Sequence, residues 1–114
     1  MWSDHKRIEE RSIALHREIA RRIYSTPALI RIAKRNIESW AERNGETPIF
    51  NEWREILDRP LDEIIEVLVS VNERGRRLRQ SSPFCGILTP QERWKIYESF
   101  TTGTYYQGSG KRSG

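Results

Sequence analysis

Three Thr-Pro pairs restrict this chain to a series of short helical segments. They are Thr26-Pro27, Thr47-Pro48 and Thr89-Pro90. Threonine is favoured at the N-cap of a helix and proline at its first helical position, so each pair predicts a helix start. Pro60 predicts a fourth start, because the residue before a proline disfavours helical geometry and ends the preceding helix. The chain is therefore expected to be all-α.

Hydrophobic periodicity between these starts predicts a compact bundle of about five to six short helices. The first, over residues 3–24, carries Ile8, Leu15, Ile19 and Ile23 on one face. Further helices are expected over residues 27–43, 48–59, 60–69, 72–80 and 90–100. The helix after Pro60 is the most hydrophobic and should be central. Trp94 and Tyr97 are expected to turn inward from the last helix.

Composition fits a single helical domain over residues 1–100, followed by a flexible Gly-rich C-terminal tail over residues 101–114. No apolar run is long enough to cross a bilayer, and the N-terminus lacks a hydrophobic signal segment, so we expect a cytoplasmic protein without a membrane partner. Cys85 is the only cysteine and there are two histidines. No disulfide, metal site or cofactor is therefore expected.

The sequence contains none of the usual catalytic motifs. It has no phosphate-binding Gly-rich loop, no paired-histidine zinc motif and no nucleophile elbow. Cys85 with His16 as a base is conceivable, but a lone cysteine between Phe84 and Gly86 is more typical of a packing residue. We expect that the protein is not an enzyme.

A strongly basic segment makes a binding function the better hypothesis. Arg74, Arg76, Arg77 and Arg79 fall within six residues of a chain whose formal net charge is +4. Three interpretations stay open: a solvated basic turn, a contact for an acidic protein surface, and a contact for nucleic acid. The helix pair around Pro60 resembles a helix-turn-helix in its connection length, but its apolar second helix argues against specific DNA recognition.

A sequence resemblance adds to this hypothesis. The block LRQSSPFCGIL (residues 78–88), followed by RWKIY (residues 93–97), is similar to a pattern in small helical bacterial proteins encoded beside a toxin gene. The upstream segment RPLDEII (residues 59–65) resembles a GPLDELL-like segment of the same proteins. The similarity runs from about Arg11 to Phe100 and includes Trp40 and Trp53. The family implied is an antitoxin family, paired with nucleotidyltransferase-like or other toxins.

The resemblance implies neutralisation of a cognate toxin by protein–protein contact. The basic helix and the connector after it would cover the toxin's active site, with Phe84 anchored in an apolar pocket. Ser81 and Ser82 would be candidate modification sites. The implied partner-binding residues are Arg74, Arg76, Arg77, Arg79, Gln80, Ser81, Ser82 and Phe84. A small basic nucleic-acid-binding or regulatory protein is the alternative function.

A structural interpretation of the same block also stays open. Pro83, Phe84 and Trp94 could serve to pin the last helix to the core. Phe84, Ile87 and Leu88 are residues that a core would use, whereas four neighbouring arginines are not. The two interpretations make opposite predictions about whether Phe84 is exposed or buried.

Overall fold

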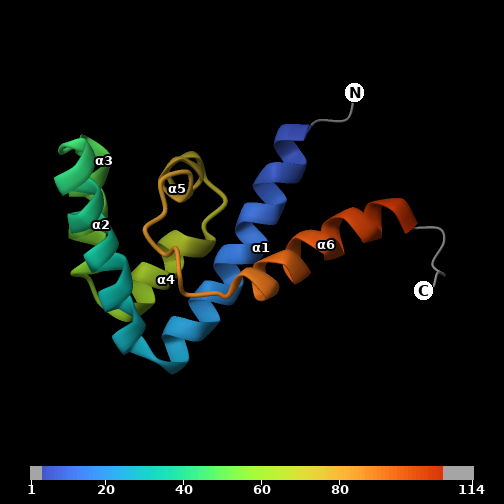
Figure 1. Ribbon diagram of the computed structural model, residues 1–114, viewed down its shortest axis with the longest axis horizontal. Coiled ribbons are helices and arrows are strands. Elements are labelled where there is room, and N and C mark those ends of the chain that lie inside the picture. Colours follow the sequence, from blue (N-terminus) through green and yellow to red (C-terminus); the bar gives the residue numbers. More distant parts are fainter. Residues whose placement is uncertain (1–3, 107–114) are drawn as a thin grey trace.

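The computed structural model describes residues 4–106, with side chains over residues 7–99, and all regular structure in this range is helical. The elements are α1 (Asp4–Ser25), a 3-10 turn η1 (Pro27–Leu29), α2 (Ile30–Asn44), α3 (Pro48–Leu57), α4 (Leu61–Val69), α5 (Glu73–Arg79) and α6 (Pro90–Tyr106) (Figure 1). The prediction of an all-α bundle is confirmed. No described helix combines the length and apolar character that a bilayer crossing requires.

The Thr-Pro pairs act as predicted at two helix starts. The Thr47 hydroxyl accepts a hydrogen bond from the backbone N–H of Phe50 at 3.3 Å. Thr89 and Glu92 form a reciprocal capping box: the Thr89 hydroxyl accepts from the Glu92 N–H at 3.1 Å, and Glu92 Oε1 accepts from the Thr89 N–H at 2.8 Å. Thr26 instead precedes the short turn η1, and its side chain caps no N–H group.

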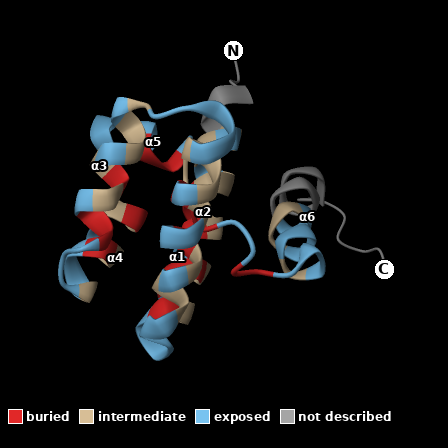
Figure 2. Cartoon of the chain, turned by 60° about the vertical axis from the view of Figure 1, so that its left-hand side comes forward, coloured by how far each residue is buried: buried red, intermediate tan, exposed pale blue. Residues whose placement is uncertain are grey.

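Helix α1 contacts more of the other elements than any other helix in the described part of the chain. It packs against α4 over part of its length and against α6 on another side, while α2 and α3 form an antiparallel pair (Figure 1). Buried positions lie on the sides of α1, α3 and α4 that face one another (Figure 2). Helix α6 contributes none of them over residues 90–99.

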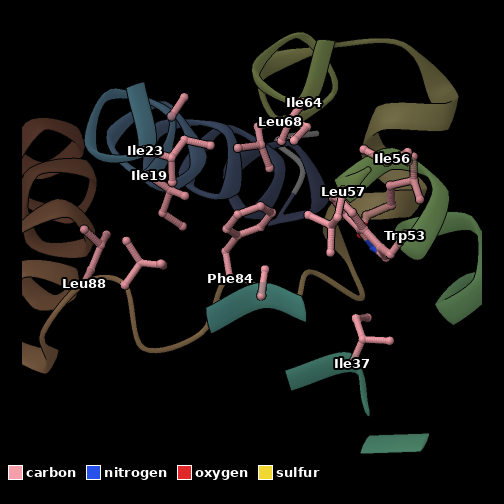
Figure 3. Packing of buried hydrophobic residues seen from close by; sticks show 14 residues of the cluster. Ile19, Ile23, Ile37, Trp53, Ile56, Leu57, Ile64, Leu68, Phe84 and Leu88 are labelled. Atoms are coloured by element: carbon pink, nitrogen blue, oxygen red, sulfur yellow. The ribbon is translucent and has the colours of Figure 1, made fainter. Parts of the chain in front are cut away.

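One hydrophobic core lies between these helices (Figure 3). Helix α4 contributes Ile64 and Leu68 to it, both buried, and contacts α1, α3 and α5. The predicted central position of α4 is therefore confirmed. The largest fully enclosed side chains of the core are Trp53, Phe84, Ile23, Ile37, Ile56, Ile64, Leu68 and Leu78.

Two side chains expected in the core lie on the surface. Ile8 is 53% exposed and Trp94 is 62% exposed. Periodicity places each on the apolar line of its helix, but no element described by the structure covers these two side chains fully. Tyr97 is half-buried, with the Arg11 guanidinium 4.3 Å from the centre of its ring.

The last helix is longer than predicted. Helix α6 continues to Tyr106, six residues beyond the expected end at Phe100. The predicted flexible tail therefore begins as helix over residues 101–106, and its remainder, residues 107–114, lies outside the described residues.

Candidate functional site

The predicted partner-binding residues lie on α5 and on the connector that follows it, residues 80–89. Asn72 starts α5, because its side-chain oxygen accepts a hydrogen bond from the Gly75 N–H at 2.8 Å. A Cβ atom on Gly75 would lie 2.8 Å from the backbone oxygen of Ser70. Glycine at this position is therefore what lets α5 approach the end of α4 so closely.

Phe84 lies inside the protein. It is 2% exposed, and its ring meets the edge of the Trp53 ring at a centroid distance of 5.9 Å and an interplanar angle of 72° (Figure 3). The Trp53 Nε1–H in turn donates a hydrogen bond to the Leu78 carbonyl at 3.1 Å. The expectation that Phe84 projects outward as an anchor is therefore wrong. The apolar pocket that holds its ring belongs to the protein's own core.

Arg79 is also turned inward, with its side chain 1% exposed. Its Nη1 donates to the carbonyls of Leu68, at 3.2 Å, and of Ser70, and its Nη2 lies 3.0 Å from Glu9 Oε2. The two carbonyls belong to the C-terminal end of α4, where no helical N–H group is left to pair with them. The expectation that Arg79 faces a partner is thus corrected, because this side chain joins the ends of α4 and α5 to α1.

Three arginines of α5 remain on the surface, and we call them the basic face: Arg74, Arg76 and Arg77. Their side chains are between 43% and 50% exposed. Arg74 and Arg77 share the Glu52 carboxylate at 3.0–3.2 Å, and Arg76 contacts Glu9 and Glu73. The Arg77 hydrogen bond, with help from Arg74, lowers the pKa of Glu52.

The connector is held by side chains that its own sequence does not indicate. Asn36 of α2 donates from Nδ2 to the carbonyls of Pro83, at 2.8 Å, and of Cys85, at 3.0 Å. The Ser82 hydroxyl accepts from the Phe84 N–H at 3.3 Å. Gly86 adopts a φ of +92°, which favours glycine. Of the other predicted residues, Gln80 is exposed and Ser81 is half-buried.

No protein-family model, curated protein or solved structure matches this chain. The function must therefore be inferred from the residues themselves.

Among the described residues, no group of three or more histidine, cysteine, aspartate or glutamate side chains is placed to hold a metal ion. Cys85 is exposed, and its thiol lies 3.8 Å from the Ser82 carbonyl, to which it can donate. His16 is buried and donates from Nδ1 to the Ser12 carbonyl at 2.8 Å. No hydrogen bond joins Cys85 to His16 among the described residues, so this geometry forms no activated thiol pair.

The buried imidazole of His16 predicts a stability change with pH. Burial, reinforced by the positive charge of Arg79, lowers its pKa from 6.5 to about 4. The unfolded chain therefore takes up a proton at a higher pH than the folded protein does. Full stability is present above pH 6.5 and is lost as the pH falls toward 4. Between pH 7.5 and 5 we expect the free energy of unfolding to fall by about 2 kcal/mol, as measured by urea denaturation.

The variant His16→Gln is the matched control for that measurement. Glutamine can keep a hydrogen bond to Ser12 but does not titrate in this range, so the variant should lose most of the decline between pH 7.5 and 5. An equal decline in the wild type and in the variant would show that other groups cause it.

Proposed function

We propose that this protein is a non-catalytic, cytoplasmic, antitoxin-like protein that neutralises a cognate toxin by direct contact through the basic face of α5. The observation that carries the proposal is the presence of three half-exposed arginines on one seven-residue helix whose end is fixed in the core. Gln80 and the edge of the connector at Ser81 and Ser82 adjoin this surface.

Rigid support favours a docking role for the basic face. Arg79 fixes the end of α5 to α4 and α1, and the Trp53 indole holds the Leu78 carbonyl in the helix's last turn. A helix of seven residues is too short to be stable alone, so these contacts hold the arginines in place. Side chains on a rigid element lose less conformational entropy on binding, which increases the affinity for a partner.

The present ion pairs of the basic face can be exchanged for those of a partner. Pairs between exposed side chains contribute only about 0–1 kcal/mol each. Inside a protein interface, from which water is excluded, guanidinium–carboxylate pairs become stronger and more specific. An acidic protein surface, such as carboxylates that hold a metal and a nucleotide in a toxin, fits this chemistry.

The same geometry makes nucleic acid a poorer partner. Glu52 and Glu73 lie among the guanidinium groups of the basic face, so a partner must compete with these two carboxylates for the arginines. Nonspecific binding to nucleic acid depends on a surplus of positive charge, which these carboxylates reduce.

The test is binding to the product of a toxin gene encoded next to this one. We expect the double variant Arg74→Gln/Arg77→Gln to bind it at least about tenfold more weakly, since two charge-assisted contacts are lost. Toxin-arrested growth should then fail to recover. Circular dichroism of the variant should match the wild type, because both side chains are half-exposed.

The matched control is Arg31→Gln/Arg35→Gln on α2. It removes the same charge from two exposed positions away from α5, so its affinity for the toxin should equal that of the wild type. Equal affinity of the wild type and the Arg74→Gln/Arg77→Gln variant would contradict the proposal. So would the absence of any complex with the toxin, or binding to duplex DNA at low salt that only this variant loses.

A further inference from the structure

A cleft of about 300 Å³ lies between α1, the connector and α6. In Figure 1, α6 starts beside α1 and then diverges from it, and the cleft is formed where these two helices and the connector meet. Its volume is at the lower end of the range for pockets that enclose a small molecule, but it can accept side chains from a segment that lies across it. No arginine of the basic face lines this cleft, so the two surfaces can be tested separately.

Accessible apolar side chains lie on both sides of the cleft. Ile8 of α1 lines it and is 53% exposed, and Leu15, two turns further along α1, lines it and is half-buried. Tyr97 lines it from α6 and is also half-buried. Trp94, which is 62% exposed, precedes Tyr97 by three residues and therefore lies beside it on the surface of α6, at the outer rim of the cleft. Exposed aromatic and aliphatic side chains gathered in this way are typical of a surface that binds another protein.

The accessible charges of the cleft are positive. Arg93 is exposed at the start of α6 and forms no ion pair within the described part of the chain. Arg11 is half-buried and lies over the Tyr97 ring. None of the described residues that line the cleft is an aspartate or a glutamate. Carboxylates on a partner would therefore be attracted to this cleft, and they would form charge-assisted hydrogen bonds with its guanidinium groups.

The carboxylate next to Arg93 in the sequence is already bound elsewhere. Glu92 pairs with Arg22 of α1 at 2.5 Å, and it closes the capping box with Thr89 at the start of α6. Since Glu92 is bound to Arg22, the guanidinium group of Arg93 is available to a partner.

The cleft fits a protein segment better than a single-stranded nucleic acid. Bases bind to protein surfaces by stacking on exposed aromatic rings. The Arg11 guanidinium, 4.3 Å from the centre of the Tyr97 ring, covers one face of that ring, so Trp94 is the one largely exposed ring beside the cleft among the described side chains. On the α1 side the accessible apolar side chains, Ile8 and Leu15, are aliphatic. Aliphatic side chains bind others of their kind by removing apolar area from water.

We propose that this cleft binds an acidic amphipathic helix of a partner protein. The apolar side chains of that helix, spaced three and four residues apart, enter the cleft between α1 and α6, as in other complexes in which a helix lies in a groove. Its acidic side chains pair with Arg93 and Arg11. Contact with Ile8, Leu15 and Trp94 supplies the affinity, and the two arginines select a partner of negative charge. This inference does not depend on the proposed toxin contact at α5.

The probe is a fluorescently labelled synthetic peptide of about four helical turns, with leucine along one face and glutamate along the other. Fluorescence anisotropy of the peptide, titrated with the full chain, should show one saturable site. Nuclear magnetic resonance of the chain should show shifts of the Ile8 methyl and Trp94 indole resonances on binding. Replacing every glutamate of the peptide by glutamine and, separately, every leucine by alanine should each weaken binding at least about tenfold.

Variants of exposed residues test the protein side without disturbing the core. Arg93→Gln should weaken binding of the glutamate peptide about tenfold and leave binding of the glutamine peptide unchanged, while Arg35→Gln on α2 should change neither. Trp94→Ala should weaken binding of both peptides. Its matched control is Tyr24→Ala, which removes an aromatic ring that is 71% exposed near the C-terminal end of α1 and should weaken neither.

Unchanged Ile8 and Trp94 resonances at millimolar peptide would overturn the proposal. Equal affinity for the glutamate and glutamine peptides would also overturn it, because it would show that the arginines select nothing. Tighter binding of a single-stranded DNA oligonucleotide, lost in Arg93→Gln, would assign the cleft to nucleic acid instead. Self-association of the chain, with the same resonance shifts in the absence of peptide, would assign it to a second copy and would contradict the proposal as well.

Discussion

Replacing Phe84 by alanine should lower the free energy of unfolding by about 3–5 kcal/mol, as found for large aromatic side chains removed from protein cores. Phe84 is 2% exposed and its ring contacts Trp53, which itself is completely buried. The substitution leaves a cavity beside Trp53 and frees the connector from the core. Urea denaturation followed by circular dichroism measures the loss.

Trp94→Ala is the control for this prediction. It removes an even larger aromatic side chain from the same sequence block, but Trp94 is 62% exposed, so the loss should stay below about 1 kcal/mol. A similar loss for the two variants would contradict the division of the block into a buried connector and an exposed helix face.

Replacing Arg79 by methionine should lower the free energy of unfolding by about 2–4 kcal/mol. Methionine keeps most of the apolar stem but removes the N–H groups that donate hydrogen bonds to the carbonyls of Leu68 and Ser70. It also removes one of the two arginines that pair with Glu9 in the described part of the chain and leaves Arg76. Buried acceptors without donors are the main cost.

Arg79→Lys separates the geometry of this interaction from its charge. Lysine keeps the positive charge but cannot reach two carbonyls and a carboxylate with a planar group, so it should restore only part of the stability. Full stability of the lysine variant would show that charge alone is required, and would contradict the role given to the α4 carbonyls.

The helix boundaries were predictable because local signals determine them. Thr89 and Glu92 form the capping box that their spacing of three residues predicts, and Thr47 caps α3. These interactions involve neighbours in the sequence, so pattern reading is sufficient. The apolar character of α4 likewise predicted its central position.

The exposure of individual residues was less predictable because it depends on distant segments. Arg79 belongs to a basic run that is typical of a surface, yet its side chain is buried. It donates hydrogen bonds to the carbonyls of Leu68 and Ser70 at the end of α4, nine to eleven residues earlier in the sequence. Trp94 fits an apolar line, yet none of the elements over residues 4–106 covers that side of α6. Neither outcome depends on local spacing.

The candidate site could be located only in part from the sequence. The basic run correctly indicated the three exposed arginines of α5, but the cleft is formed by residues from three separate segments. Ile8, Gln80 and Arg93 come together there only through the packing of α1, the connector and α6. The two hydrogen bonds from Asn36 to the connector join residues that are 47 and 49 positions apart in the sequence, and no sequence signal predicts them.

The most direct test of this account compares two arginines two positions apart on α5, by urea denaturation of Arg77→Met and Arg79→Met. Arg77 is 50% exposed, and its one ion pair within the described residues is with Glu52, so its replacement should change the free energy of unfolding by less than about 1 kcal/mol. The Arg79 variant should lose about 2–4 kcal/mol. Equal, small losses would contradict the claim that the buried Arg79 side chain fixes α5 to α4 and α1, while the half-exposed arginines of the basic face remain accessible to a partner.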